Sequence, residues 1–149
     1  FLLRNFGKQG GVYYDFARGV DLRAVQPARI RKSVGCEHTL EQDVDAPAAL
    51  LIELYHVVLD LEGRIARSGF RGSTLTFKIK FADFSQHTRS VTRREAFETK
   101  ADILPLAKRL LAQAREELGD RPVRLLGLSV SNSLPDAPVC YVRQLKFDF

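Results

Sequence analysis

The chain contains no methionine and no tryptophan, and its 149 residues include only two cysteines and three histidines. Because no methionine stands even at position 1, we expect an excised piece of a longer protein. Cys36 and Cys140 lie far apart and have no Cys-x-x-Cys spacing, which predicts two reduced thiols in a cytoplasmic protein rather than a disulfide framework. Two cysteines and three scattered histidines also form no cluster of zinc ligands.

Long apolar runs are absent as well. No stretch approaches the roughly 20 apolar residues that cross a bilayer. Arg4, Asn5 and Lys8 interrupt the N-terminus, unlike a signal peptide, so we expect no membrane partner. Hydrophobic residues still make up 45% of the chain, which is enough for a core. The length predicts one domain, or one domain with a fragment of another.

The charge is moderately basic: 23 Lys and Arg residues exceed 18 Asp and Glu residues, giving a net charge of +5. A single exposed lysine is more often a solvated surface residue than a ligand-binding one. Here, however, the basic residues gather in and beside predicted strands, and a basic sheet face favours phosphate as its ligand. They are Arg29, Arg31, Lys32, Lys78, Lys80, Arg89, Arg93 and Arg94.

Four segments are predicted as strands: residues 32–40, 73–81, 87–94 and 123–130, with a turn at 82–86. The segments 32–40 and 73–81 alternate between two faces, as half-buried strands do, and 87–94 is a returning strand rich in Thr, Ser and Arg. On the clearest strand Leu75, Phe77, Ile79 and Phe81 share one face, and Thr76, Lys78 and Lys80 share the other. The strands therefore predict a sheet with one apolar and one polar face.

Two segments repeat apolar residues at helical spacing. The first has Asp45 as its expected N-cap and Pro47 in its first turn, and Gly69 and Gly72 end it. The second has Asp102 as its expected N-cap, Pro105 in its first turn and Gly119 as a left-handed stop. The expected buried residues are Leu50, Leu51, Leu54, Val57, Val58, Leu61, Ile65, Leu106, Leu110, Leu111, Ala114 and Leu118.

The resulting order, β-α-β-β-α-β, predicts an α+β two-layer sandwich: a four-stranded sheet with two helices on one face. The other face, here called the open face, is left to solvent or a partner. We expect on it Ser33, Glu37, Thr39, Thr76, Lys78, Lys80 and part of 88–94. Hydroxyls, amines and the backbone N–H groups near Gly35 donate to phosphate oxygens. Without exposed aromatic residues for base stacking, a duplex backbone fits better than a single strand.

The two ends of the chain have a different character. A short helical signal at 12–17 has too few apolar neighbours to fold alone, which predicts the edge of another domain. At the other end, Leu145, Phe147 and Phe149 alternate with polar residues behind Gln144, after the Pro-containing stretch 134–138. This tail fits equally an extended peptide that fills pockets on a partner and a final strand of the chain's own core.

These segments, taken in order, resemble the DinB-type branch of the Y-family translesion DNA polymerases. Residues 6–8 and 17–21 resemble the end of its thumb, and Arg31-Lys32-Ser33-Val34-Gly35 resembles the entry into its little-finger domain. Residues 75–84 with Thr88-Arg89-Ser90 resemble the hairpin of that domain, and 123–130 its last strand. Gln144–Phe149 is similar to the family's sliding-clamp-binding motif.

The resemblance implies a division into a thumb fragment at 1–21, a linker at 22–31, a little-finger domain at 32–132 and a flexible tail at 133–149. It also implies two partners, primer–template duplex DNA and the bacterial sliding clamp. The implied DNA-contacting residues are Lys32, Ser33, Gly35, Lys78, Lys80, Thr88, Arg89, Ser90 and Thr92. The implied clamp-binding residues are Gln144, Leu145, Phe147 and Phe149.

The resemblance places the catalytic palm, with its two Mg²⁺ ions, upstream of Phe1. Neither Glu116-Glu117 nor the pair Asp43 and Asp45 resembles the palm carboxylates. We therefore expect this piece to need no cofactor and not to polymerise, whereas the parent enzyme needs Mg²⁺. Two alternatives stay open: a non-catalytic DNA and clamp interaction module of a polymerase-related accessory protein, and an unrelated basic α+β nucleic-acid-binding domain.

Overall fold

The computed structural model describes residues 1–26, 28–135 and 141–143. Contacts divide the described chain into two compact units, one built mainly from residues up to Arg29 and a larger one from Ile30 to Val142. The smaller unit holds α1 (Leu2–Phe6) and α2 (Lys8–Ala17). The helical signal expected at 12–17 therefore begins earlier, at Lys8.

Gly10 explains why α2 extends through a pair of glycines. A Cβ at this position would lie 2.2 Å from the carbonyl oxygen of Leu2, so only glycine allows α2 to pack this closely on the backbone of α1. Gly7 joins the two helices with φ of 54°. Packing between the helices thus offsets the low helix propensity of glycine.

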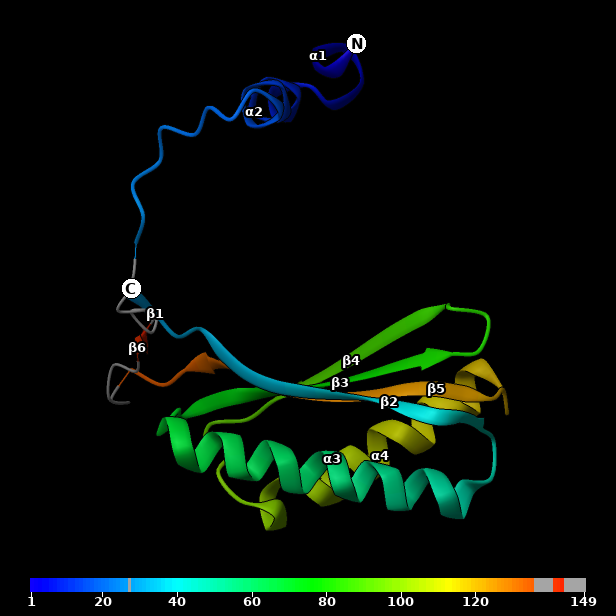
Figure 1. Ribbon diagram of the computed structural model, residues 1–149. Coiled ribbons are helices and arrows are strands. Elements are labelled where there is room, and N and C mark those ends of the chain that lie inside the picture. The colour runs from blue at the N-terminus through cyan, green and yellow to red at the C-terminus, as the bar shows by residue number, and fades with distance from the viewer. Residues whose placement is uncertain (27, 136–140, 144–149) are drawn as a thin grey trace. The chain divides into compact units, whose positions relative to one another are not determined.

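The larger unit contains a four-stranded antiparallel sheet, drawn above two helices in Figure 1. Its strands are β2 (Ser33–Val44), β3 (Gly72–Phe81), β4 (Gln86–Thr92) and β5 (Val123–Ser133), in the spatial order β2-β5-β3-β4. The helices α3 (Pro47–Ser68) and α4 (Lys100–Leu118) both cover one face of the sheet. The predicted α+β two-layer sandwich is confirmed.

A separate pair of short strands lies outside this sheet. β1 (Ala28–Ile30) pairs with β6 (Tyr141–Arg143), although the two segments are far apart in the sequence. Three of the residues expected to belong to a linker are thus in a strand. The pairing brings the chain that leaves β5 back to the segment that leads into β2.

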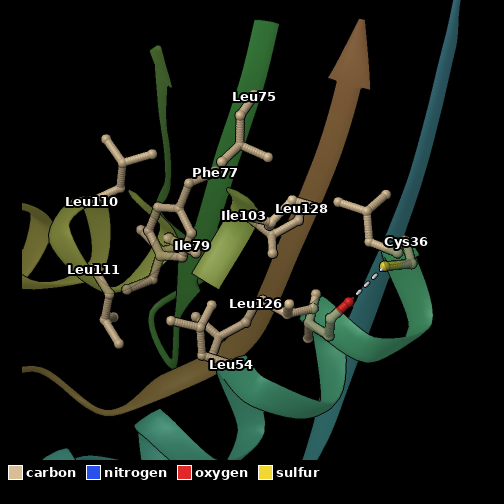
Figure 2. Packing of buried hydrophobic residues seen from close by; sticks show 14 of the residues in the cluster. Cys36, Leu54, Leu75, Phe77, Ile79, Ile103, Leu110, Leu111, Leu126 and Leu128 are labelled. Atoms are coloured by element: carbon tan, nitrogen blue, oxygen red, sulfur yellow. Dashed lines mark hydrogen bonds between the residues drawn. The ribbon is translucent and has the colours of Figure 1, made fainter. Parts of the chain in front are cut away.

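The core fills the space between the sheet and the two helices, as Figure 2 shows. Leu75, Phe77, Ile79 and Phe81 alternate inward from β3 and are essentially inaccessible to solvent, as the period-two pattern predicted. Leu54 of α3 and Leu110 and Leu111 of α4 pack against them. The expectation that Leu51 is buried is wrong: it is 40% exposed, because the helical turn carries it beyond the buried face of α3.

Both helix starts differ from their predicted form. The N-cap of α3 is Ala46, not Asp45, and no side chain caps it. The N-cap of α4 is Thr99, and Asp102 is the N3 residue of a capping box whose carboxylate accepts a hydrogen bond from the Thr99 backbone N–H at 3.1 Å. Pro105 consequently lies inside α4 rather than in its first turn.

The helix ends fall where glycine predicted them. Gly69 ends α3 in the left-handed conformation, with φ of 65° and ψ of 17°. Gly119 ends α4 with φ of 81° but an extended ψ of 167°, so the predicted left-handed form is wrong there. Both positions need positive φ, which glycine adopts without steric cost.

Candidate nucleic-acid interface

The strand register arranges the open face in rows that run across all four strands. One row joins Ser33, Ser131, Thr74 and Thr92, and the next joins Gly35, Ser129, Thr76 and Ser90. A third row joins Glu37, Gly127, Lys78 and Thr88, and a fourth joins Thr39, Leu125, Lys80 and Gln86. The sheet therefore brings most of the predicted DNA-contacting residues onto one surface.

The first two rows consist of hydroxyl side chains and one glycine. The Oγ1 atoms of Thr74 and Thr92 lie 2.9 Å apart, and Thr76 Oγ1 lies 2.8 Å from Ser90 Oγ. A hydroxyl has one hydrogen and two acceptor lone pairs, so each pair retains one hydrogen that is not shared between its two oxygens. These rows present short polar groups that suit a phosphate backbone and carry no base-reading pattern.

Gly35 keeps the second row flat. A Cβ at this position would lie 2.7 Å from the Cβ of Ser129 and 3.0 Å from the carbonyl oxygen of Leu128. Any larger residue would push β2 away from β5. Gly35 thus contributes to the surface by its lack of a side chain, which allows another backbone to approach closely.

The sequence interpretation missed the contribution of β5. Ser129 and Ser131 occupy the open face, while Leu126, Leu128 and Val130 are buried on the other side. A signal was present in the sequence, because small residues occupy every second position from 127 to 131. Ser129 lies between Gly35 and Thr76, near the middle of the face.

The two predicted lysines are less free than the sequence indicated. Lys78 Nζ lies 2.8 Å from Glu37 Oε1 and 2.9 Å from Oε2. Lys80 Nζ lies 4.7 Å from the centre of the Phe84 ring, which Arg124 also contacts. Phe84, at 61% exposure, is an aromatic residue at the margin of a surface that was expected to have none.

Arg89 does not join the open face. It stands opposite Phe77, so its side chain leaves β4 on the side of the helices and forms an ion pair with Glu117 of α4. Thr88, Ser90 and Thr92, by contrast, lie on the open face and are exposed. The prediction that Arg89 lies on the same face as these residues is therefore wrong, because neighbouring residues of a strand point to opposite faces. Lys32 immediately precedes β2 and is exposed.

A pocket of about 390 Å³ lies in this surface; we call it the open-face pocket. It is lined by Gly35, Cys36, Glu37, Arg64, Thr76, Lys78, Thr88, Gly127, Leu128 and Ser129. Cys36 itself belongs to the core: its thiol donates a 3.3 Å hydrogen bond to the carbonyl oxygen of Val57, drawn in Figure 2. Burial raises the pKa of Cys36 to about 12, so this thiol is not a nucleophile at neutral pH.

Within residues 1–26, 28–135 and 141–143, no group of three or more His, Cys, Asp or Glu residues is arranged to hold a metal ion. In the same part of the chain, no helix has the length and apolar character needed to cross a membrane. The predicted clamp-binding residues Gln144, Leu145, Phe147 and Phe149 lie outside the described residues.

Comparison with known families assigns this architecture. Residues 31–146 match the model of the impB/mucB/samB family C-terminal domain. The chain belongs to this family. The matched residues include the whole four-stranded sheet and the two helices α3 and α4. The resemblance to DinB-type Y-family polymerases is confirmed.

Two relatives share more than half of their aligned residues with this impB/mucB/samB domain chain. DNA polymerase IV of Bacteroides fragilis is 56% identical over 136 residues, covering 91% of this chain and 37% of the relative. DNA polymerase IV of Akkermansia muciniphila is 54% identical over 132 residues, covering 89% of this chain and 36% of the relative. The chain therefore spans little more than a third of the length of these curated relatives.

Two solved structures are similar to this chain in fold. A complex of the β-clamp processivity factor and the little finger domain of PolIV matches with a TM-score of 0.58 and 28% identity, covering 78% of this chain and 99% of the solved chain. A Y-family chimera of Dbh and Dpo4 matches with a TM-score of 0.65 over 89% of this chain and 38% of the chimera. At 19% identity, that second likeness shows the fold alone.

Proposed function

We propose that this chain is the DNA-gripping and clamp-tethering part of a translesion DNA polymerase similar to DNA polymerase IV. The observation that carries the proposal is the open face, with two adjacent rows of hydroxyls and glycine on a domain of the impB/mucB/samB family. The 56% identity to a DNA polymerase IV supports the same assignment for the parent protein.

The mechanism at this face is backbone recognition. Ser33, Thr76 and Ser129 donate hydroxyl hydrogens to non-bridging phosphate oxygens of primer–template duplex, and Lys78 and Lys80 add positive charge. Such contacts fix the position of the duplex without reading its bases, as an enzyme that moves along any template requires. The core beneath holds the strands, and with them the hydroxyl rows, in a fixed geometry.

The tail supplies the second half of the function. Gln144, Leu145, Phe147 and Phe149 bind a pocket of the bacterial sliding clamp as an extended peptide. A solved complex of a β-clamp with the little finger domain of PolIV, 28% identical to this chain, supports this partner. Tethering raises the concentration of the polymerase at the primer end without any new contact to DNA.

Catalysis belongs to the parent enzyme rather than to the described residues. A polymerase of this type adds nucleotides to a primer across damaged template, with Mg²⁺ held by carboxylates of a palm domain. The role of the present chain is to hold the product duplex while that chemistry proceeds. The chain spans 37% of the Bacteroides fragilis relative, which leaves ample length for such a domain in the parent.

The proposal is tested with a charge introduced at the centre of the hydroxyl rows. Ser129→Asp places a carboxylate where phosphate is expected, and it should weaken binding of a labelled primer–template duplex, measured by fluorescence anisotropy. Gln113→Asp is the matched control, because Gln113 is exposed on α4, which covers the opposite side of the sheet. Equal affinities of the two variants would reject the open face as the DNA surface.

A further inference from the structure

A second pocket lies along β2, an edge strand of the sheet, where the first two rows of the open face end at Ser33 and Gly35. Its volume is about 450 Å³. It is lined by Arg31, Ser33, Val34, Gly35, Arg64, Arg67 and Ser68, and we call it the arginine pocket. Its lining contains three guanidinium groups and no carboxylate. The start of β2 and the last turn of α3 build it together.

Arg64 is held in place from two sides. Its Nε donates to Asp60 Oδ1 at 3.1 Å, and its Nη1 donates to the carbonyl oxygen of Gly35 at 3.1 Å. The hydrogen bond from Arg64 holds the pKa of Asp60 below its ordinary value. These bonds fix the guanidinium between helix and strand, and its side chain is still 47% exposed.

Arg31 and Arg67 differ from Arg64, because no carboxylate of the described residues neutralises their charge. Among the described residues, neither forms an ion pair, and the Nε of Arg31 is buried without any hydrogen-bond partner. A buried donor without a partner is costly, and buried polar groups in folded proteins are nearly always satisfied. Three guanidinium groups surround one pocket, and among the residues that the structure describes Asp60 is the only carboxylate bonded to them. They therefore leave an excess of positive charge that an anion would neutralise.

The position of the pocket beside the open face indicates which anion it binds. Gly35 and Arg64 line both the arginine pocket and the open-face pocket, so the two are adjacent around the edge of β2. Guanidinium groups bind phosphate oxygens in a bidentate fork that a lysine cannot reproduce. We propose that the arginine pocket binds a backbone phosphate of the duplex that lies on the open face. This inference rests on the proposed function and extends the DNA contact around the sheet edge.

The test removes the guanidinium of Arg67, which has no ion-pair partner in the described part of the chain. Arg67→Ala should weaken duplex binding several-fold at low salt and lower the slope of log K against log salt by about 0.9, the loss of one phosphate contact. Arg109→Ala is the control: Arg109 is exposed on α4, and its removal changes the net charge equally. Arg67→Lys keeps the charge and should retain the slope while losing part of the affinity.

The outcomes separate this inference from the proposed function. If wild type binds duplex and Ser129→Asp does not, but Arg67→Ala behaves like Arg109→Ala, the arginine pocket is overturned and the open face stands. If wild type fails to bind duplex at all, both are overturned. Titration with inorganic phosphate, followed through the Nε–Hε NMR signals of Arg64 and Arg67, distinguishes the phosphate source. If inorganic phosphate saturates these signals but Arg67→Ala leaves the affinity for duplex unchanged, the pocket is a site for free anions and the inference is contradicted.

Discussion

Lys78 and Glu37 face each other across β5, with the lysine amine within 2.9 Å of both carboxylate oxygens. Gly127 stands between them in the same row, and a Cβ there would lie only 2.9 Å from Glu37 Cγ. The missing side chain of Gly127 thus gives Glu37 the room to reach Lys78. In the free protein, this lysine of the open face is paired, and phosphate must compete with a carboxylate for it.

Glu37→Gln should therefore tighten duplex binding. The substitution releases Lys78 and removes a negative charge from the surface that meets phosphate, so the affinity should rise several-fold and the salt slope should steepen by about 0.9. An exposed ion pair is worth only about 0–1 kcal/mol, so stability should change little. Anisotropy titrations at several salt concentrations measure the effect, with Glu116→Gln on α4 as the charge-matched control. Unchanged or weaker binding would contradict this account of the row.

Gly35→Ala should destabilise the domain and weaken duplex binding together. The new Cβ would meet Ser129 at 2.7 Å and the backbone of β5 at 3.0 Å, which forces β2 outward. Overpacking of this kind costs roughly 1–3 kcal/mol. Urea unfolding measures the loss. Gly11→Ala is the comparison, because its Cβ has ordinary contact only, at 3.8 Å from the Leu3 side chain. A Gly35→Ala protein as stable as wild type would disprove the close approach of β2 and β5.

The Cys36 thiol should make the fold less stable at alkaline pH. Its folded pKa is raised by burial to about 12, whereas an unfolded cysteine titrates near 8.5. A raised folded pKa contributes stability that is complete below the unfolded pKa and is lost as pH rises from about 8.5 towards 12, at up to about 1.4 kcal/mol per pH unit. Unfolding free energies measured from pH 7 to 10 in a Cys140→Ser background should show the decline, and Cys36→Ala should reduce it.

Removal of the tail should separate the two partners. A chain that ends at Arg143 should lose binding to purified bacterial sliding clamp and keep its affinity for duplex, because the residues proposed to contact DNA all lie between Arg31 and Ser131. Calorimetric titration of both chains into the clamp provides the measurement. Loss of clamp and duplex binding together would show that the tail is a structural part of the domain.

The sequence predicted the fold because its patterns are long and regular. Strict alternation of polar and apolar residues over the eight residues 74–81 is compatible with only one choice of buried face, and β3 buries that face. The helix starts were less determined, since Thr99 and Asp102 are both good N-caps and only the capping box decides between them. Shifting the cap by three residues also moved Pro105 out of the first turn.

The surface could be predicted only in part, because it depends on contacts between distant strands. Arg89 was assigned to the DNA surface together with its neighbours Thr88 and Ser90 because all three belong to one hairpin. Adjacent residues of a strand point to opposite faces of the sheet, however, so Arg89 lies on the helix side. The pairing of Lys78 with Glu37 joins residues 41 positions apart and requires the order β2-β5-β3. The arginine pocket likewise joins the start of β2 to the end of α3, which no local pattern reveals.

If this domain holds duplex DNA by its backbone, its affinity should not depend on base sequence. The first measurement is the affinity of the wild-type chain for two primer–template duplexes of unrelated sequence, at salt concentrations from about 50 to 200 mM. We expect equal affinity for both duplexes and a steep linear fall of log K with log salt. A strong preference for one sequence, or an affinity that salt does not change, would contradict recognition of the backbone.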